Sequence, residues 1–136
     1  MSHPRVLSVG QCLFDKRKIA NHFEEQFDIQ VKTADTFDEA LAELRGGPYN
    51  LVLVNRVTDE DGSLGVELIR ALKQDPALSG TDVMLVSNLP DAQADAVALG
   101  ALPGFGKSEL KAPEVVERLS ALLAADDRTA PGSSSN

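Results

Sequence analysis

The chain has 136 residues, of which 43% are hydrophobic, 25% charged and 4% aromatic. This composition suits one domain with a core of Val, Leu and Ala. The net charge of −8 disfavours nonspecific binding to nucleic acid or to an anionic membrane. The single cysteine, Cys12, excludes an internal disulfide and fits a reducing compartment. Because no apolar run approaches the roughly 20 residues of a membrane span and no signal peptide precedes the first strand, we expect a soluble, cytoplasmic protein.

The first half of the chain predicts two strands that alternate with two helices. A short apolar run at Val6–Val9 predicts a strand, and apolar residues at spacings of four predict a helix from residue 13 to about residue 26. Alternating residues 28–33 predict an edge strand. The next helix should have Thr36 as its N-cap and should stop at Gly46-Gly47-Pro48.

The second half continues the same alternation. Strands are expected at residues 51–54, at Asp82–Val86 and near residues 104–106, and helices at residues 65–74 and 90–99. A last helix should begin at Pro113. Because the chain turns polar from residue 125, we expect a folded domain over residues 1–124 and a disordered C-terminal tail over residues 125–136.

Five strand–helix pairs predict an α/β fold, in which a doubly wound parallel sheet is covered by helices on both faces. Two topologies fit this alternation, a flavodoxin-like strand order 2-1-3-4-5 and a Rossmann-like half. In the flavodoxin-like order, ligands bind beyond the carboxyl ends of strands one and three, where the sequence order reverses. The residues expected there are Gly10, Gln11, Asn55, Ser87 and Lys107.

The motifs at this edge resemble the receiver domain of two-component response regulators. The resemblance covers residues 5–123, and its most specific parts are the apolar run before Asn55, the run that ends at Ser87, and Gly100 with Lys107 seven residues later. It implies the three-layer α/β/α, CheY-like form of the flavodoxin fold. It also implies that Asn55 stands at the phosphoacceptor position, Ser87 at the hydroxyl that contacts the phosphoryl group, and Lys107 at the lysine that neutralises it.

The chain departs from the family at positions on which the family's chemistry depends. Gly10 and Gln11 stand where two acidic residues hold Mg²⁺, and neither can supply the charge that this hard cation needs. Asn55 replaces a carboxylate nucleophile, and an amide cannot give an acyl phosphate. Gly104 stands at the position of the switch aromatic, while Phe105 should face the opposite side of the strand. We therefore expect a degenerate pseudo-receiver that binds no Mg²⁺ and no other cofactor.

Three side chains keep more than one interpretation. Asn55 either caps its own loop or takes a direct part in recognition. Cys12 either packs half-buried or is reactive near Lys107. Lys107 needs an acceptor in the crevice, because an unpaired buried charge is costly. The competing acceptors are the Asn55 oxygen, Asp15, and the acids of the following loop, Asp59, Glu60 and Asp61.

The resemblance implies a stand-alone receiver-like domain in two-component or phosphorelay signal transduction, which is not an enzyme and acts by protein–protein recognition. In the family, helix four, strand five and helix five commonly carry the contacts, here residues 91–99, 104–106 and 113–123. The expected partners are a histidine kinase, another regulator or a second copy of the chain, but neither nucleic acid nor membrane. Two alternatives remain open: an anion or small-molecule sensor that uses the vacated crevice, and a phosphorylatable receiver that carries an introduced Asn55.

Overall fold

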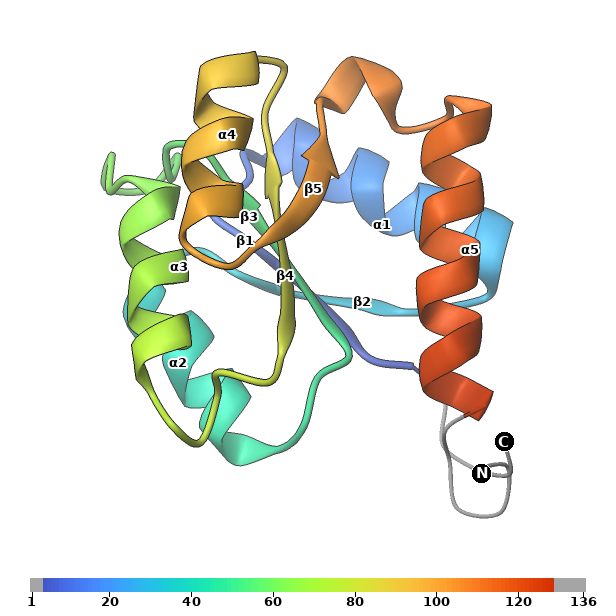
Figure 1. Cartoon of the computed structure of the whole chain (residues 1–136). Helices are drawn as coiled ribbons and strands as arrows, with labels where there is room; N and C mark the ends of the chain where they lie inside the picture. The colour runs from blue at the N-terminus through green and yellow to red at the C-terminus, as the bar shows by residue number, and fades with distance from the viewer. Residues whose placement is uncertain (1–3, 129–136) are drawn as a thin grey trace.

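Five parallel strands form one sheet with helices on both faces in the computed structural model, which describes residues 4–128 (Figure 1). The strand order, β2-β1-β3-β4-β5, confirms the predicted flavodoxin-like topology. The strands are β1 (Val6–Val9), β2 (Val31–Ala34), β3 (Leu51–Asn55), β4 (Asp82–Val86) and β5 (Leu102–Phe105). The helices are α1 (Leu13–Phe27), α2 (Phe37–Gly46), α3 (Gly65–Gln74), α4 (Pro90–Ala98), a short 3₁₀ helix η1 (Lys107–Glu109) and α5 (Pro113–Arg128).

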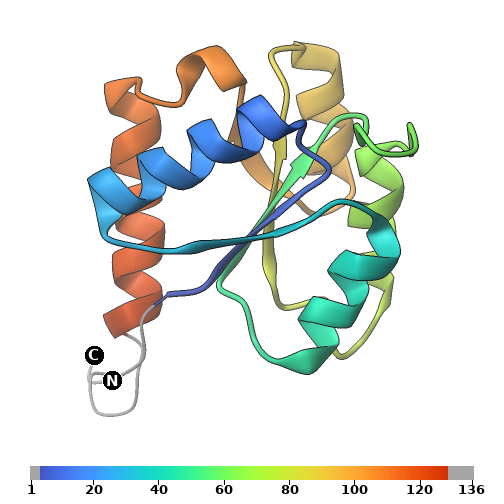
Figure 2. The ribbon, with the colours of Figure 1, turned by 180° about the vertical axis from the view of Figure 1, so that it is seen from behind.

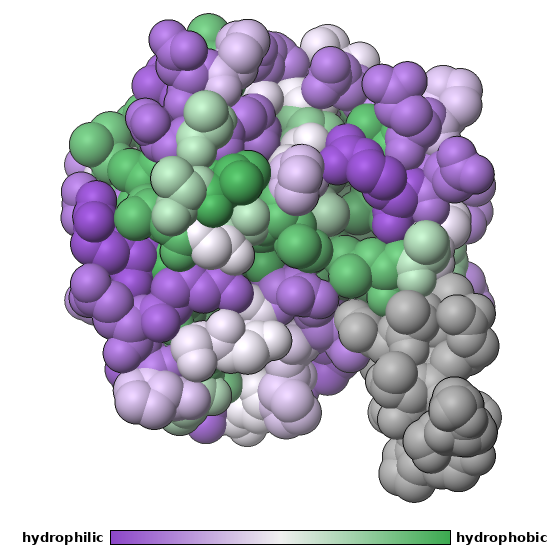
Figure 3. Space-filling view, in the orientation of Figure 1, coloured by the Kyte–Doolittle hydropathy of each residue, from purple (hydrophilic) through white to green (hydrophobic). Residues whose placement is uncertain are grey.

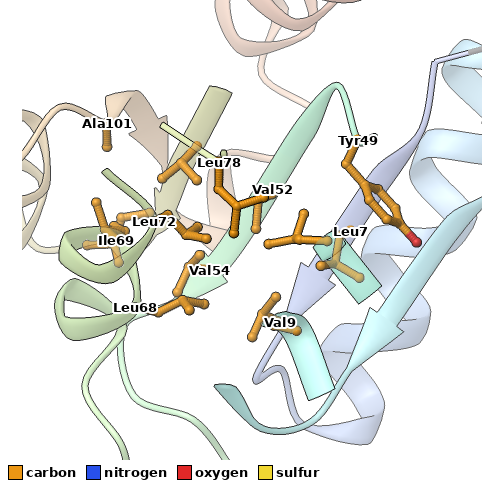
Figure 4. Packing of buried hydrophobic residues seen from close by; sticks show 14 of the residues in the cluster. Leu7, Val9, Tyr49, Val52, Val54, Leu68, Ile69, Leu72, Leu78 and Ala101 are labelled. Carbon is orange, nitrogen blue, oxygen red and sulfur yellow. The ribbon is translucent and has the colours of Figure 1, made fainter. Parts of the chain in front are cut away.

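The sheet separates two hydrophobic cores. Helices α2, α3 and α4 cover one face and helices α1 and α5 the other, as two opposite views show (Figures 1 and 2). Alternate residues of a strand point to opposite faces, so Leu7 and Val9 pack toward α2 and α3 (Figure 4). Val6 packs toward α1 on the other face. The central strands β1 and β3 are buried on both faces, which explains their continuous apolar runs.

Strand β2 differs from its predicted range of residues 28–33. It begins at Val31, because the residues before it end helix α1 instead. Asp28 takes the left-handed conformation, with φ at 57°, and its N–H donates to the Glu24 carbonyl 3.0 Å away. The Ile29 N–H donates to the Phe23 carbonyl at 3.3 Å, so this segment completes a helix C-cap.

Strand β5 was predicted near residues 104–106 but lies at Leu102–Phe105. The Gly106 N–H donates to Glu109 Oε1 at 2.8 Å, so Gly106 caps η1 and does not extend the strand. Helix α5 reaches Arg128, so residues 125–128, which were expected in the C-terminal tail, belong to the helix. Ala124 and Ala125 are strong helix formers and carry it onward. Residues 129–136 of the predicted tail lie outside the described residues. Among residues 4–128, no helix combines the length and apolarity needed to cross a membrane.

Candidate functional site

The carboxyl edge of the sheet carries the polar crevice that the topology predicts. Three of the predicted residues, Asn55, Ser87 and Lys107, line a single hollow of about 390 Å³. Gly10 joins the crevice through its carbonyl, which bonds Asn55. Gln11 and Gly104 do not line the hollow: Gln11 is buried beside it, and Gly104 lies on β5 facing α4. The hollow is completed by Arg56, Val57, Val86, Asn88 and Leu89.

Asn55 ends β3 and uses its whole amide to fasten the surrounding loops. Its Nδ2 donates to the Gly10 carbonyl at 3.0 Å and to the Val57 carbonyl at 2.6 Å. Its Oδ1 accepts from the Arg56 N–H at 3.0 Å. The loop-capping interpretation of Asn55 is therefore the one that the geometry favours. The two carbonyl oxygens converge on a nitrogen donor, so an acceptor-only carboxylate in the same place would face them without a proton to share.

Gly10 is held in place by the loop that follows Asn55. Its φ is +79°, and a Cβ at this position would lie 2.7 Å from Thr58 Cγ2. Thr58 is itself buried, and the Asp59 N–H donates to the Gly10 carbonyl at 2.9 Å. Only a residue without a side chain fits between strand and loop here. The space beside Gly10 that an acidic side chain would need is thus filled by Thr58, a residue that sequence reasoning did not single out.

The donor set of the crevice does not fit Mg²⁺. Gly10 offers no side chain, and the Gln11 amide is 3% exposed, with neither its oxygen nor its nitrogen hydrogen-bonded. The Gly10 and Val57 carbonyls, which are neutral acceptors, are already occupied by Asn55 Nδ2. Among the described residues, no three His, Cys, Asp or Glu side chains gather at one point.

Lys107 is neutralised by Asp15 of helix α1, one of the acceptors that the sequence offered. Its Nζ lies 2.7 Å from Asp15 Oδ2, and the Cys12 thiol donates to the same oxygen at 3.3 Å. Burial raises the pKa of Asp15, but the bonds from Lys107 and Cys12 and the positive charge of Lys107 outweigh it, so this pKa lies below its usual value. Cys12 is half-buried, as the packing interpretation of this residue expected.

Ser87 and its neighbour Asn88 organise the opposite wall. The Ser87 hydroxyl accepts from the Leu89 N–H at 3.1 Å, just before α4 begins. The Ser108 hydroxyl donates to Asn88 Oδ1 at 3.1 Å. A Cβ on Gly106 would overlap that same Asn88 oxygen, so the backbone passes directly over it. The wall therefore joins the end of β4 to the turn that carries Lys107.

The acidic loop after Asn55 is shaped by its own hydrogen bonds. The Thr58 hydroxyl donates to Asp61 Oδ1 and accepts from the Ser63 N–H at 2.9 Å. The bond from Thr58 and, after it, a bond from the Ser63 N–H to Asp61 Oδ1 at 3.0 Å lower the pKa of the exposed Asp61. The side chains of Asp59 and Glu60 form no hydrogen bond or ion pair with any described residue. The loop is thus ordered but does not reach Lys107.

Gly104, which the resemblance puts at the position of the switch aromatic, is hydrogen-bonded by Gln93 of α4. Gln93 Nε2 donates to the Leu85 carbonyl at 2.8 Å and to the Ser87 carbonyl at 3.1 Å, while its Oε1 accepts from the Gly104 N–H at 3.0 Å. A Cβ on Gly104 would overlap the Leu85 carbonyl oxygen. Phe105 is 2% exposed in the core beside α5, on the opposite face of β5, as predicted. The sequence offered one signal for Gln93, namely that it is the uncharged polar residue of a helix otherwise built of Ala, Asp, Pro and Val.

Searches by sequence find no matching family model and no matching curated protein. Solved structures do match. The signal receiver domain of a DNA-binding response regulator from Colwellia psychrerythraea has a TM-score of 0.71 and 22% identity, over 89% of this chain and 98% of that one. The receiver domain of a signal transduction histidine kinase from Syntrophus aciditrophicus has a TM-score of 0.72 and 23% identity, over 92% and 93%.

The chain has the receiver-domain fold. The chemotaxis response regulator CheY4 of Vibrio cholerae also matches, with a TM-score of 0.68 and 19% identity over 90% of this chain and all 100% of that one. Each of these identities is below 25%, so the similarity is one of fold. In this receiver fold, the crevice at the ends of β1, β3 and β4 holds an amide, an internal ion pair and a threonine.

Proposed function

We propose that this chain is a receiver-like signalling domain that is not phosphorylated at Asn55 and acts by protein–protein recognition. It would work in a cytoplasmic two-component or phosphorelay pathway, with a histidine kinase or another regulator as its partner and without catalysing a reaction. The proposal rests on one observation, the orientation of the Asn55 amide. With Nδ2 bound to two carbonyls, the residue at the phosphoacceptor position is committed to holding the fold.

Two further contacts support the loss of phosphoryl chemistry. The lysine that would neutralise a phosphoryl group already has a partner in Asp15. The position of one metal-binding acid is Gly10, and the space beside it is filled by Thr58. A receiver that took up phosphate here would have to break the Lys107 ion pair and find charge for Mg²⁺ elsewhere.

The face formed by α4, β5 and α5 is the one we propose for the signalling partner. Hydrophobic residues gather over α4 and β5 on this side (Figure 3). Asp95 is the only charged residue between positions 92 and 106, and Val97 is 43% exposed. Arg118 holds α5 against β5 by donating to the Pro103 carbonyl at 2.7 Å and the Gly104 carbonyl at 3.1 Å. A surface poor in charge and rich in small apolar side chains suits a protein partner.

The test is intact-mass spectrometry after incubation with acetyl phosphate and Mg²⁺, with a phosphorylatable receiver treated in parallel. We expect no added phosphoryl group on this chain and full reaction of the control. A hydroxylamine-labile adduct of one phosphoryl group would refute the proposal. The wild-type codon at position 55 tests the remaining alternative, a competent receiver into which Asn55 was introduced. An aspartate codon there would support this alternative.

An anion sensor is the second candidate, because Lys107, Arg56 and the Ser87 hydroxyl all line the hollow. Such donors suit a phosphate or carboxylate group. The pairing of Lys107 with Asp15 counts against it, since an anion would have to displace the carboxylate. Titration with inorganic phosphate, followed by NMR, tests this candidate. Saturable shifts at Ser87 and Lys107 that Lys107→Ala abolishes would support it, and no shift at tens of millimolar would exclude it.

A further inference from the structure

Four large hydrophobic side chains are exposed at the edge of the sheet that carries the crevice. They stand where helices begin, because each helix of a parallel α/β fold starts beyond the carboxyl end of a strand. Phe14 is the most exposed, at 74%, and Leu13 beside it is 60% exposed. Leu64, before α3, is 49% exposed, and Leu89, before α4, is 50% exposed. An aromatic side chain that remains this open in a folded domain suggests a surface that another protein covers.

Charges of opposite sign flank the two residues at the start of α1. Arg17 and Lys18 follow Phe14 by one helical turn and are exposed. On the other side lies the loop with the exposed acids Asp59 and Glu60. The Asp59 N–H donates to the Gly10 carbonyl at 2.9 Å, and this bond fixes the loop beside the start of α1. Figure 2 shows the start of α1 and this loop side by side. Among the described residues, none of these four charges forms an ion pair.

We propose that this surface binds a second copy of the same chain. We call it the Phe14 surface, and it comprises Leu13, Phe14, Arg17, Lys18, Asp59 and Glu60. In a twofold symmetric dimer, each copy presents the same patch to the other, so the patch must complement itself. An apolar centre with basic residues on one side and acidic residues on the other meets that requirement. A twofold axis near Phe14 places the basic side of each copy against the acidic side of its partner.

The charge pattern favours a second copy over the other classes of partner. An anionic membrane would attract Arg17 and Lys18 but repel Asp59, Glu60 and the net charge of −8. A partner with charges of one sign would satisfy only half of the surface. The Phe14 surface comprises six residues, few beside the roughly 20–30 that each side of a stable interface contributes. The dimer should therefore be weak, dependent on concentration and sensitive to salt.

The experiment is sedimentation equilibrium of the full chain over a range of concentrations. We expect the average mass to rise from 14.5 kDa toward twice that value, and to fall back at high salt. Phe14→Ser should weaken the association about tenfold or more, because it removes the apolar anchor. A chain that stays monomeric at every concentration and at low salt would overturn the proposal.

Charge-reversal variants of the Phe14 surface test whether its two sides contact each other between copies. The variant Arg17→Glu/Lys18→Glu makes both sides of the surface acidic, and Asp59→Lys/Glu60→Lys makes both sides basic. Each variant alone should remain monomeric, because like charges then face each other. An equimolar mixture of the two should form a heterodimer, and the chain that carries all four substitutions should dimerise again. Rescue of this kind is expected only when the two sides of the surface contact each other between copies.

The control variant is Glu24→Lys/Glu25→Lys, which changes the net charge as much as Asp59→Lys/Glu60→Lys but lies on the last turns of α1. It should dimerise like the unaltered chain. A dimer that survives both reversals at the Phe14 surface but dissolves with Val97→Glu would place the contact on α4 and overturn the proposal. None of these outcomes bears on phosphorylation, which the acetyl phosphate experiment tests separately.

Discussion

Lys107 Nζ lies 2.7 Å from Asp15 Oδ2, so the lysine of the crevice is neutralised from helix α1 of the same chain. The two side chains are partly buried, with 32% of Lys107 and 17% of Asp15 exposed. Their bond joins the start of α1 to the turn before α5, two elements on the same face of the sheet. The ion pair therefore acts as a structural contact where the family resemblance predicts a phosphoryl-binding group.

A double-mutant cycle with Asp15→Asn and Lys107→Met should give a coupling free energy of about 1 kcal/mol. Urea unfolding of the four proteins at neutral pH measures it. The exposed Glu67–Arg70 pair, with 3.7 Å between its charged atoms, is the matched control and should show almost no coupling. Because the pKa of Asp15 is lower in the folded state, the coupling is complete above the unfolded pKa of about 3.9 and is lost as the pH falls through the folded pKa. Coupling that does not weaken as the pH falls would contradict this assignment.

Asn55→Asp should lower the free energy of unfolding by about 1–3 kcal/mol, because it removes the donor to two partly buried carbonyls and leaves them facing a carboxylate. Asn50→Asp is the control, since the bond that Asn50 makes, from the Arg5 N–H to Oδ1 at 2.7 Å, needs only an acceptor. Urea unfolding compares the two variants. Equal stability of Asn55→Asp and the unaltered chain would show that the amide is not needed. Recovery of the lost stability by Mg²⁺ would show that the crevice can hold the metal after all.

His22 should make the fold less stable in mild acid. It is 5% exposed between Phe23 and Phe27, its Nε2 has no hydrogen-bond partner, and burial lowers its pKa. The unfolded chain takes up a proton near pH 6.5, whereas the folded chain resists it until the pH is lower. Stability should thus fall as the pH drops below 6.5, by at most about 1.4 kcal/mol per pH unit. His22→Leu should remove this part of the pH dependence in urea unfolding between pH 7.5 and 5, and an unchanged slope would refute the assignment.

Gln93 should hold α4 in one conformation. The unaltered chain is expected to show little microsecond-to-millisecond exchange over residues 87–105 in NMR relaxation dispersion. Gln93→Ala removes three hydrogen bonds to β4 and β5 and should increase both this exchange and amide hydrogen exchange across α4. Gln26→Ala, an exposed substitution of the same kind on α1, is the control. Strong coupled dispersion in the unaltered chain would indicate a two-state switch and contradict this prediction.

Local patterns predicted the elements of the fold better than the contacts that occupy its crevice. The alternation of apolar runs and amphipathic stretches was enough for the parallel α/β fold, the family resemblance selected the strand order, and strand β4 and helix α3 have the predicted bounds. Asp15 was predicted only as one of several competing acceptors for Lys107. Thr58 and Gln93 were missed, because their roles depend on Gly10 and Gly104, and a contact between distant residues leaves no periodic signal. Strand β5 was misplaced for a similar reason, since only the bond from Gly106 to Glu109 ends it.

The contact between Thr58 and Gly10 also sets an order in which mutations can be tolerated. An acidic residue introduced first at position 10 would meet both the Thr58 methyl and a backbone with φ at +79°. The same change made after the loop had shortened, or after Thr58 had become glycine, would meet only the backbone. A designed variant with an acidic residue at position 10 would therefore need a remodelled β3–α3 loop before β1 is changed. The conformation of this loop, as well as the strand, limits which side chains position 10 can carry.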